Sequence, residues 1–212
     1  TRYGDQRVLA GTDLVLQRGE RIAIMGPSGS GKSTLLNCIA GLEELDAGNI
    51  RFKGQVLGRE STAASTLLRR GEITSIFQFF HLVPTLRSWE NVEFPLLLEG
   101  CEKAERRDRV SSLMEEVGLL HRAEAWPSEL SGGEMQRLAI ARALITEPAL
   151  ILADEPTGSL DSKNSERILG MLMELTGRHQ TALLMVTHDA EAAEICQEIR
   201  HMADGKLSGG AG

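Results

Sequence analysis

The sequence has few cysteines, few aromatic residues and no long apolar run. Its three cysteines, Cys38, Cys101 and Cys196, lie far apart, and no pair has the spacing of a metal site. This favours reduced thiols in a cytosolic protein over a disulfide framework. No apolar run approaches the roughly 18 residues of a membrane span, and we identify no signal peptide.

Positive charge is also scarce. The chain has 23 Lys and Arg against 30 Asp and Glu, a formal net charge of −7. Nonspecific nucleic-acid binding needs basic surface that displaces counterions, so we expect no nucleic-acid partner. The 212 residues, 42% of them hydrophobic and 25% charged, are typical of one soluble globular domain, or of one domain with a subdomain.

The most informative stretch is a glycine-rich loop at 26–33, GPSGSGKS. An apolar run at 21–25 precedes it, and a helical pattern at 34–40 follows it and stops at Gly41. Strand, loop and helix with G-x-x-x-x-G-K-[ST] spacing predict a phosphate-binding P-loop. Glycines let backbone N–H groups approach an anion, and the helix dipole points at the same place. Lys32 would neutralise the terminal phosphates, and the Ser33 hydroxyl would bind Mg²⁺.

We assign nucleotide binding to the whole loop and to the residue after it. These residues are Gly26, Pro27, Ser28, Gly29, Ser30, Gly31, Lys32, Ser33 and Thr34.

Two further apolar runs lead into polar residues. The run 149–153 is followed by Asp154 and Glu155, and the run 182–186 leads to His188. Such runs are typical of parallel strands covered on both faces, and ligands bind at the carboxyl ends of those strands. Alone, the acidic pair would be an exposed turn and the histidine structural. Beside a P-loop, we predict that Asp154 holds Mg²⁺, Glu155 polarises the attacking water and His188 senses the γ-phosphate.

A second glycine turn, Ser131-Gly132-Gly133, also opens a helix. The N–H groups of a helix N-terminus suit an anion, so the turn is a candidate second phosphate site. It has no lysine, however, and a serine-capped helix start explains it equally well.

The remaining pattern predicts an α/β fold class: a P-loop NTPase core with a mostly parallel sheet, an antiparallel β subdomain and an inserted α-helical subdomain. Apolar residues at helical spacing predict a helix that ends at Gly118, and a second helix from the glycine turn to Pro148. We further expect a helix at 162–176, a hairpin at 48–57 that bends at Lys53-Gly54, a helix at 61–70, a strand at 73–77 and short strands at 8–9 and 14–16.

With its motifs in this order, the sequence resembles the nucleotide-binding domain of ATP-binding-cassette (ABC) transporters. Residues 26–33 match the Walker A motif, 149–155 the Walker B motif and 130–134 the LSGG(Q/E) signature. Single residues match the Q-loop glutamine, the D-loop aspartate, the switch histidine and the aromatic residue that stacks on adenine; they are Gln78, Asp161, His188 and Tyr3. Stretches at 77–86, 90–92, 133–137 and 154–161 are similar to the macrolide-export and lipoprotein-release branch of bacterial ATPases.

The resemblance implies a single ABC ATPase domain over 1–212. The RecA-like core with the antiparallel β subdomain would comprise residues 1–77 and 148–212. The helical subdomain, which carries the signature, would comprise residues 78–147. It implies ATP and Mg²⁺ as cofactors. The catalytic residues would be Lys32, Glu155 and His188, and the metal ligands Ser33, Gln78 and Asp154, with Gln78 also contacting nucleotide.

The resemblance also implies partners. In this family two domains pair head to tail, so Ser131, Gly132 and Gly133 would bind the γ-phosphate held by a partner copy, and Asp161 would communicate across the interface. We therefore expect a homodimer or a pseudo-dimer with a similar chain, and integral membrane transporter subunits on separate chains. The chain would be cytoplasmic and peripheral on the inner face of the inner membrane.

The function implied is that of the ATP-hydrolysing subunit of a bacterial ABC transporter, for export or release of a substrate from the inner membrane. An alternative is an ATP-gated mechanical regulator of a membrane complex that transports no substrate. Five of the eight aromatic residues lie between 77 and 94. They indicate either a groove for a membrane subunit, with Phe79, Phe80 and His81 as its best candidates, or packing of the helical subdomain.

Overall fold

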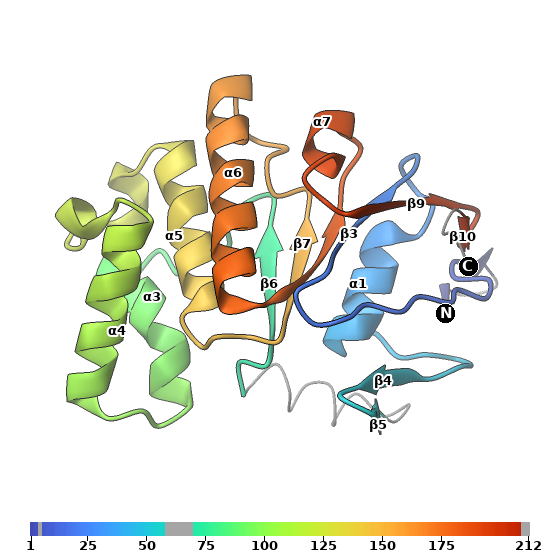
Figure 1. Ribbon diagram of the computed structural model, residues 1–212, viewed down its shortest axis with the longest axis horizontal. Helices are drawn as coiled ribbons and strands as arrows, with labels where there is room; N and C mark the ends of the chain where they lie inside the picture. Colours follow the sequence, from blue (N-terminus) through green and yellow to red (C-terminus); the bar gives the residue numbers. More distant parts are fainter. Residues whose placement is uncertain (4–5, 58–69, 209–212) are drawn as a thin grey trace.

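The computed structural model describes residues 1–3, 6–57 and 70–208, with the backbone alone for residues 2, 3, 6 and 7 (Figure 1). The helix expected at 61–70 lies, apart from Arg70, outside the described residues. Among the residues that the structure describes, no helix is both long enough and apolar enough to span a bilayer.

A six-stranded sheet in the order β10-β9-β3-β8-β7-β6 forms the centre of the described structure. Its parallel strands are β3 (Arg21–Met25), β6 (Ile73–Phe77), β7 (Leu150–Asp154), β8 (Ala182–Val186) and β9 (Glu198–Ala203). The edge strand β10 (Lys206–Ser208) pairs with β9 in the antiparallel sense. The predicted α/β class with a mostly parallel sheet is confirmed.

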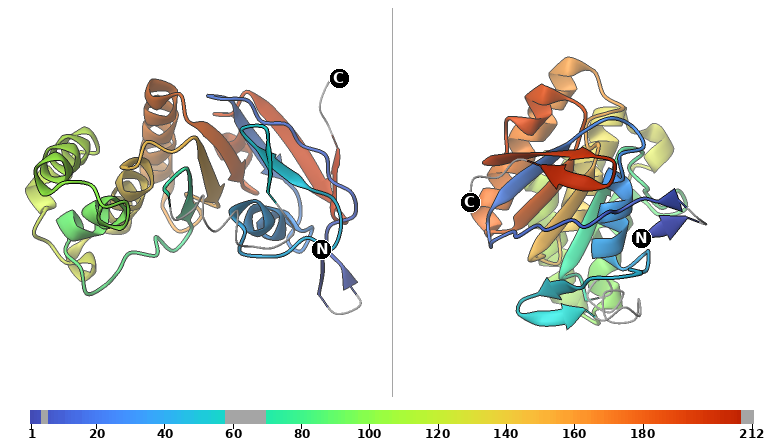
Figure 2. Two further views of the ribbon diagram at one scale, coloured as in Figure 1. Left: turned by 90° about the horizontal axis from the view of Figure 1, so that it is seen from below. Right: turned by 90° about the vertical axis from the view of Figure 1, so that its right-hand side faces the viewer.

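Helices cover both faces of this sheet. α1 (Lys32–Ala40) lies against one face, and α5 (Gly132–Leu144) and α6 (Ser162–His179) lie against the other (Figure 2). Alternate residues of each strand therefore enter different cores: Ile151 and Ala153 pack with α5 and α6, whereas Leu150 and Leu152 pack with α1. Because both faces are buried at the centre of the sheet, residues 150–153 of β7 and all of β8 are unbroken apolar runs rather than alternating ones.

Two antiparallel hairpins lie outside the large sheet. β1 (Arg2–Tyr3) pairs with β2 (Gln6–Arg7), and β4 (Ile50–Phe52) pairs with β5 (Gln55–Leu57). The second hairpin turns at Lys53 and Gly54, with φ values of 47° and 78°, as a two-residue turn with left-handed backbone requires. The predicted hairpin and its bend are confirmed.

α3 (Ser88–Leu98) and α4 (Lys103–Glu116) pack with α5 beside the sheet, at the left of Figure 1. The short 3-10 helices η1 (Leu120–Arg122) and η2 (Pro127–Glu129) connect α4 to α5. The helix predicted before Gly118 is confirmed, and its apolar face is fully buried at Val110 and Met114. α5 ends at Leu144, four residues before Pro148, so the predicted end is wrong. A residue before proline is disfavoured in helical conformation, and Glu147 has φ 52°.

α6 extends three residues beyond its predicted end at Thr176. Its buried face is as predicted, with Ile168, Leu169, Leu172 and Leu175 all less than 7% exposed. The helix ends where Gln180 adopts a left-handed C-cap, and Arg178 and His179 in its last turn suit the negative end of the helix dipole.

The strands expected at 8–9 and 14–16 are wrong: in the described structure, residues 8–20 belong to no strand. The segment still buries apolar side chains, because Leu9, Leu14 and Leu16 pack into the core around α1. Its backbone instead follows the turn between β9 and β10, where the Ala10 N–H donates to the Gly205 carbonyl at 2.8 Å. The C-terminal strands β9 and β10 were not among the predicted elements.

The stability of α6 provides a test of this packing. Leu172→Ala removes a side chain that is 0% exposed and should lower the free energy of unfolding by about 2–5 kcal/mol. The neighbouring Met173 is 42% exposed, so Met173→Ala should change it by less than about 0.5 kcal/mol. Urea denaturation measures both, and equal losses in the two variants would contradict the assigned inner face.

Candidate functional site

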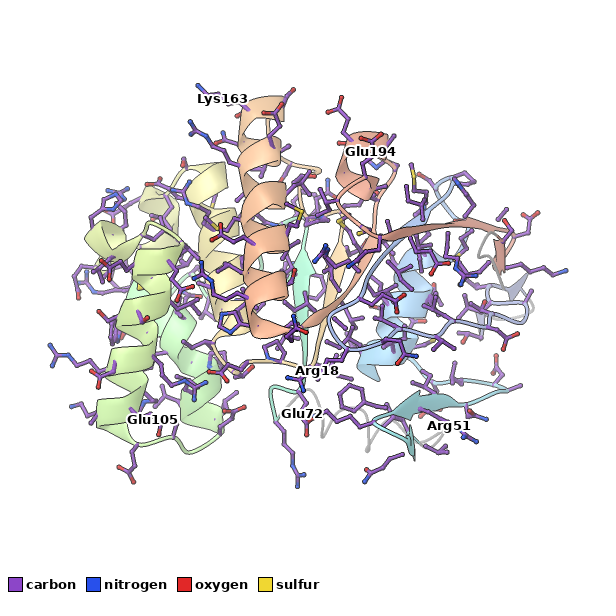
Figure 3. The ribbon with its side chains drawn as sticks, in the orientation of Figure 1. Arg18, Arg51, Glu72, Glu105, Lys163 and Glu194 are labelled. Carbon is purple, nitrogen blue, oxygen red and sulfur yellow. The ribbon has the colours of Figure 1, made fainter. Side chains whose placement is uncertain are left out.

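Four parallel strands end in one row, and the motifs follow directly after that row. The register pairs Phe77 with Asp154, Asp154 with Val186, and Val186 with Ile24. Lys163, in the first turn of α6, lies at this edge in Figure 3, whereas Arg18 and Glu72, which precede β3 and β6, lie at the opposite edge. The carboxyl-end edge therefore gathers Gln78, Glu155, Thr187 and the loop after β3.

The loop after β3 folds around its own lysine. Lys32 is 9% exposed, and its Nζ donates to the carbonyls of Gly26 at 2.8 Å and Pro27 at 2.9 Å. A Cβ at Gly26 would lie 2.1 Å from the Met202 carbonyl, so only glycine fits there. Gly31 caps α1 with φ 103°, and the first N–H groups of α1 follow it. The loop thus joins a cation and helix N–H groups, the two features that bind phosphate.

Asp154, at the end of β7, faces this loop. Burial raises the pKa of the Asp154 carboxyl, and a hydrogen bond from the Ser33 hydroxyl and the charge of Lys32 lower it in part. A hydroxyl and a carboxylate are the hard oxygen ligands that Mg²⁺ prefers, usually together with substrate phosphates. Among the described residues, no group of three or more His, Cys, Asp and Glu side chains gathers as a metal site of protein ligands alone. The donor set at Ser33 and Asp154 therefore fits an ion completed by phosphate.

Gln78 lies beside the same row, because it follows the partner of Asp154 in β6. Its backbone carbonyl accepts from Ser159 Oγ at 2.8 Å, and its side-chain amide lies against Gly158, where a Cβ would come within 2.9 Å of Nε2. The structure thus places the Gln78 amide against the loop that follows Glu155.

Glu155 and His188, which follow β7 and β8, are in direct contact, an interaction that the sequence did not predict. Glu155 Oε1 lies 2.7 Å from His188 Nδ1, and Thr187 Oγ1 donates to Glu155 Oε2 at 3.3 Å. The Glu155 backbone N–H donates to the Val186 carbonyl at 2.9 Å, and its φ is 48°. The carboxylate is thereby oriented by two side chains of the neighbouring strand end, as a general base requires.

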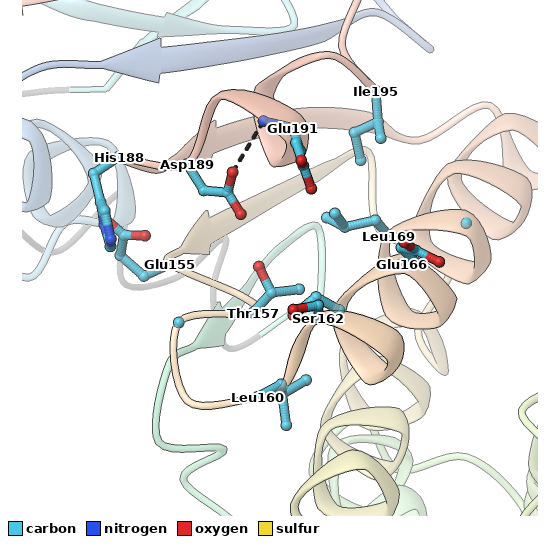
Figure 4. A pocket seen from close by; sticks show the side chains of 13 residues that line it. Glu155, Thr157, Leu160, Ser162, Glu166, Leu169, His188, Asp189, Glu191 and Ile195 are labelled. Carbon is cyan, nitrogen blue, oxygen red and sulfur yellow. Dashed lines mark hydrogen bonds and ion pairs between the residues drawn. The ribbon is translucent and has the colours of Figure 1, made fainter.

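A pocket of about 460 Å³ opens beside this pair, between the loop after β7, the first turns of α6 and α7 (Ala190–Ala193). In Figure 4, Glu155 and His188 stand at one end of it, and Leu169 and Ile195 at the other. Further carboxylates line it, at Glu166, Asp189 and Glu191. The P-loop residues 26–33, all of which the structure describes, are not among its lining. Its acidic lining disfavours phosphate, which leaves the P-loop as the better phosphate site.

The second glycine turn is a capped helix start, as one of its two interpretations predicts. Ser131 is the N-cap of α5: its Oγ accepts from the Glu134 N–H at 3.3 Å, while its own N–H and Oγ donate to Glu134 Oε2, each at 2.8 Å. The Ser131 N–H is the main cause that lowers the pKa of the Glu134 carboxyl, and Arg122 lies 3.4 Å from its other oxygen. Capping does not exclude a phosphate role, because the first N–H groups of α5 have no partners within the helix.

Asp161 caps α6 and lies close to this turn. Its carboxylate accepts from the Asn164 N–H at 3.0 Å and from Asn164 Nδ2 at 2.6 Å. A Cβ at Gly133 would lie 3.1 Å from Asn164 Oδ1, so α5 and α6 meet closely at Gly133. Within one chain, however, the two glycine turns are separated, because α1 and α5 lie on opposite faces of the sheet (Figure 2).

Tyr3 lies in β1, paired with Gln6, and its side chain is outside the described part of the chain. The adenine-stacking role of Tyr3 therefore stays a prediction.

Arg142 of α5 was missed from the sequence. Its guanidinium donates to the Phe80 carbonyl at 2.9 Å and to the His81 carbonyl at 2.6 Å, and both of these residues have positive φ. Burial lowers the pKa of Arg142. The contact fixes the segment after Gln78, where Phe79 is 70% exposed and Phe77 packs on His81. Trp89 instead packs against the core, so the aromatic cluster divides between surface and interior.

Comparisons with known proteins all lead to one family. The family model described as ABC transporter matches residues 9–158. The lipoprotein-releasing system ATP-binding protein LolD of Saccharophagus degradans is 43% identical over 201 residues, which cover 95% of this chain and 88% of that protein. The ABC transporter ATP-binding protein YbbA of Escherichia coli K12 is 44% identical over 200 residues, which cover 94% and 88%.

Two solved structures are similar over nearly the whole chain. The ATP-binding cassette MJ0796, in a dimeric post-hydrolysis state bound to ADP and Pi, has a TM-score of 0.85 at 36% identity and covers 100% of this chain and 95% of its own. Another dimeric structure of MJ0796, described as a bacterial ABC transporter cassette, has a TM-score of 0.83 at 38% identity and covers 97% and 91%.

The burial of Asp154 makes a prediction about stability without nucleotide. Because burial raises its pKa, the folded chain binds this proton more tightly than the unfolded chain. The resulting stabilisation is present in acid and is lost as pH rises through the folded pKa. At neutral pH, Asp154→Asn should therefore raise Tm, by about 2–4 °C if the gain is about 1 kcal/mol.

Thermal unfolding of both proteins at neutral pH and in acid checks this. The difference should shrink in acid, where the wild-type carboxyl is protonated. A lower Tm for the variant at neutral pH would show that the ionised carboxylate stabilises the fold.

Proposed function

This chain belongs to the ABC transporter family as an ATP-binding and ATP-hydrolysing subunit, and we propose that it powers export or release of a substrate from the bacterial inner membrane. The relatives named LolD are lipoprotein-releasing system ATP-binding proteins, which supports a lipoprotein as the substrate class. The comparisons give no support to the alternative of a regulator that transports nothing.

The observation that carries this proposal is the aligned row of strand ends. It places the P-loop, Asp154 and the Glu155–His188 pair at one edge of the sheet. Phosphoryl transfer to water needs a cradle for the phosphates and an oriented base for the water, and little covalent chemistry from the protein. This edge supplies both.

In the proposed mechanism, the N–H groups of residues 26–34 and Lys32 bind the phosphates of ATP. The Lys32 ammonium group releases the carbonyls of Gly26 and Pro27 and donates to phosphate oxygens instead. Ser33, Asp154 and Gln78 would hold Mg²⁺, which when bound neutralises charge that develops on the phosphates. Glu155 orients and polarises the attacking water, and Thr187 and His188 hold its carboxylate in place.

The second phosphate site acts in trans in this proposal. Ser131, Gly132 and Gly133 bind the γ-phosphate held by a partner copy, because one chain keeps its two glycine turns on different faces of the sheet. Asp161 communicates across the interface through Asn164, which lies between it and Gly133. The dimeric MJ0796 structures support this pairing. Tyr3 stacks on the adenine.

We propose a homodimer, or a pseudo-dimer with a similar chain, bound to integral membrane subunits on separate chains at the cytoplasmic face of the inner membrane. No nucleic acid takes part. Residues 1–77 and 148–212 act as the nucleotide-binding core with its β subdomain, and 78–147 as the helical subdomain. The exposed Phe79 and the loop that Arg142 holds offer a contact for the membrane subunits.

Size-exclusion chromatography of Glu155→Gln with ATP and Mg²⁺ tests this function. We expect the variant to lose turnover and to shift from monomer to dimer only when ATP is present, because bound ATP is no longer hydrolysed. Ser131→Arg in the same background should abolish the shift, since its side chain would fill the trans phosphate site.

An ATPase assay of the wild type and of Glu155→Gln provides the second readout. Turnover in Glu155→Gln equal to that of the wild type would contradict the role of Glu155. An ATP-dependent dimer that persists in the Ser131→Arg background would contradict the trans site.

A further inference from the structure

Gln136 is a polar side chain buried in the apolar interior of α5. It is 0% exposed, as are its helix neighbours Leu138 and Ile140. Its Nε2 donates to the Pro156 carbonyl at 2.5 Å, and this contact joins two segments twenty positions apart in sequence. None of the roles proposed above uses this residue.

Pro156 directly follows Glu155, so this hydrogen bond holds the loop that carries the general base. The backbone of Glu155 is in the left-handed region, with φ 48°. Residues other than glycine avoid this conformation unless neighbouring contacts maintain it. On one side, the Val186 carbonyl accepts from the Glu155 N–H at 2.9 Å. On the other side, the Gln136 amide donates to the carbonyl of Pro156, the residue after Glu155. Glu155 is thus clamped between β8 and α5.

Packing alone does not explain a glutamine at this position. Its Oε1 is buried and has no hydrogen-bond partner in the described structure. A buried unpaired acceptor lowers stability, and an apolar side chain of similar volume would avoid that penalty. What the amide supplies and an apolar side chain does not is the N–H group for the Pro156 carbonyl.

We propose that Gln136 is a positioning residue for ATP hydrolysis, which fixes the Pro156 carbonyl and thereby the turn that aims the Glu155 carboxylate. The proposal rests on the role assigned above to Glu155.

Steady-state kinetics of two substitutions tests the positioning role. Gln136→Met keeps the approximate volume but has no donor, and Gln136→Asn keeps the amide but is one methylene too short to reach Pro156. Both should lower kcat by about tenfold or more, because small displacements of a reacting group have large effects on rate. The KM for ATP should stay within about twofold, since α5 and the helix that follows the P-loop, α1, pack on opposite faces of the sheet.

Ile140→Val is the matched control. It removes a methyl group from the same helix at a position that is also 0% exposed. It should lower Tm and leave kcat unchanged, whereas the Gln136 variants should lose kcat out of proportion to any change in Tm.

Glu155→Gln, assayed in parallel, separates this inference from the proposed function. Inactive Glu155→Gln together with wild-type kcat in either folded Gln136 variant would overturn the positioning role alone. The positioning role would also be overturned if Ile140→Val lost kcat in the same ratio to its Tm change as the Gln136 variants do. General loosening of α5 would then explain the effect. Glu155→Gln with wild-type turnover would overturn both.

Discussion

Parallel hydrogen bonding of β6, β7, β8 and β3 in one register is the constraint on which the rest of the structure depends. It places Phe77, Asp154, Val186 and Ile24 in a single row, so four chain segments leave the sheet at the same edge. Residues from distant parts of the sequence thereby come within hydrogen-bond distance, as Glu155 and His188 do at 2.7 Å. A shift of one strand by one residue would exchange its two buried faces and separate this pair.

The sequence predicted those elements whose local pattern and tertiary environment agree. Runs such as 182–186 are apolar throughout because both faces of the sheet are covered, so β8 was predicted to the residue. The periodicity of α6 identified its buried face, and glycine-rich spacing identified the loop around Lys32. The rule that ligands bind at the carboxyl ends of parallel strands also identified Asp154, Glu155 and His188 as candidate site residues. It did not provide the contact between Glu155 and His188, because that depends on β7 and β8 being neighbours, which periodicity does not reveal.

The elements that were missed depend on tertiary contacts rather than local pattern. β9 alternates exposed and partly buried residues and has only one fully buried position, Met202, so it is not a clear apolar run. Residues 8–16 carry an apolar pattern but follow the β9–β10 turn instead of forming a strand. Gln136 and Arg142 resemble ordinary polar residues of a helix. Only the fold shows that each donates to a backbone carbonyl of a motif loop.

The central claim is that one chain carries two halves of different sites, and mixing two inactive variants tests it most directly. Ser131→Arg retains the P-loop half and Lys32→Met retains the signature half. If the sites form head to tail, a mixed dimer contains one intact site, and an equimolar mixture should recover about a quarter of wild-type ATPase activity for random pairing in a two-fold dimer. A mixture no more active than the two variants assayed separately would contradict the account.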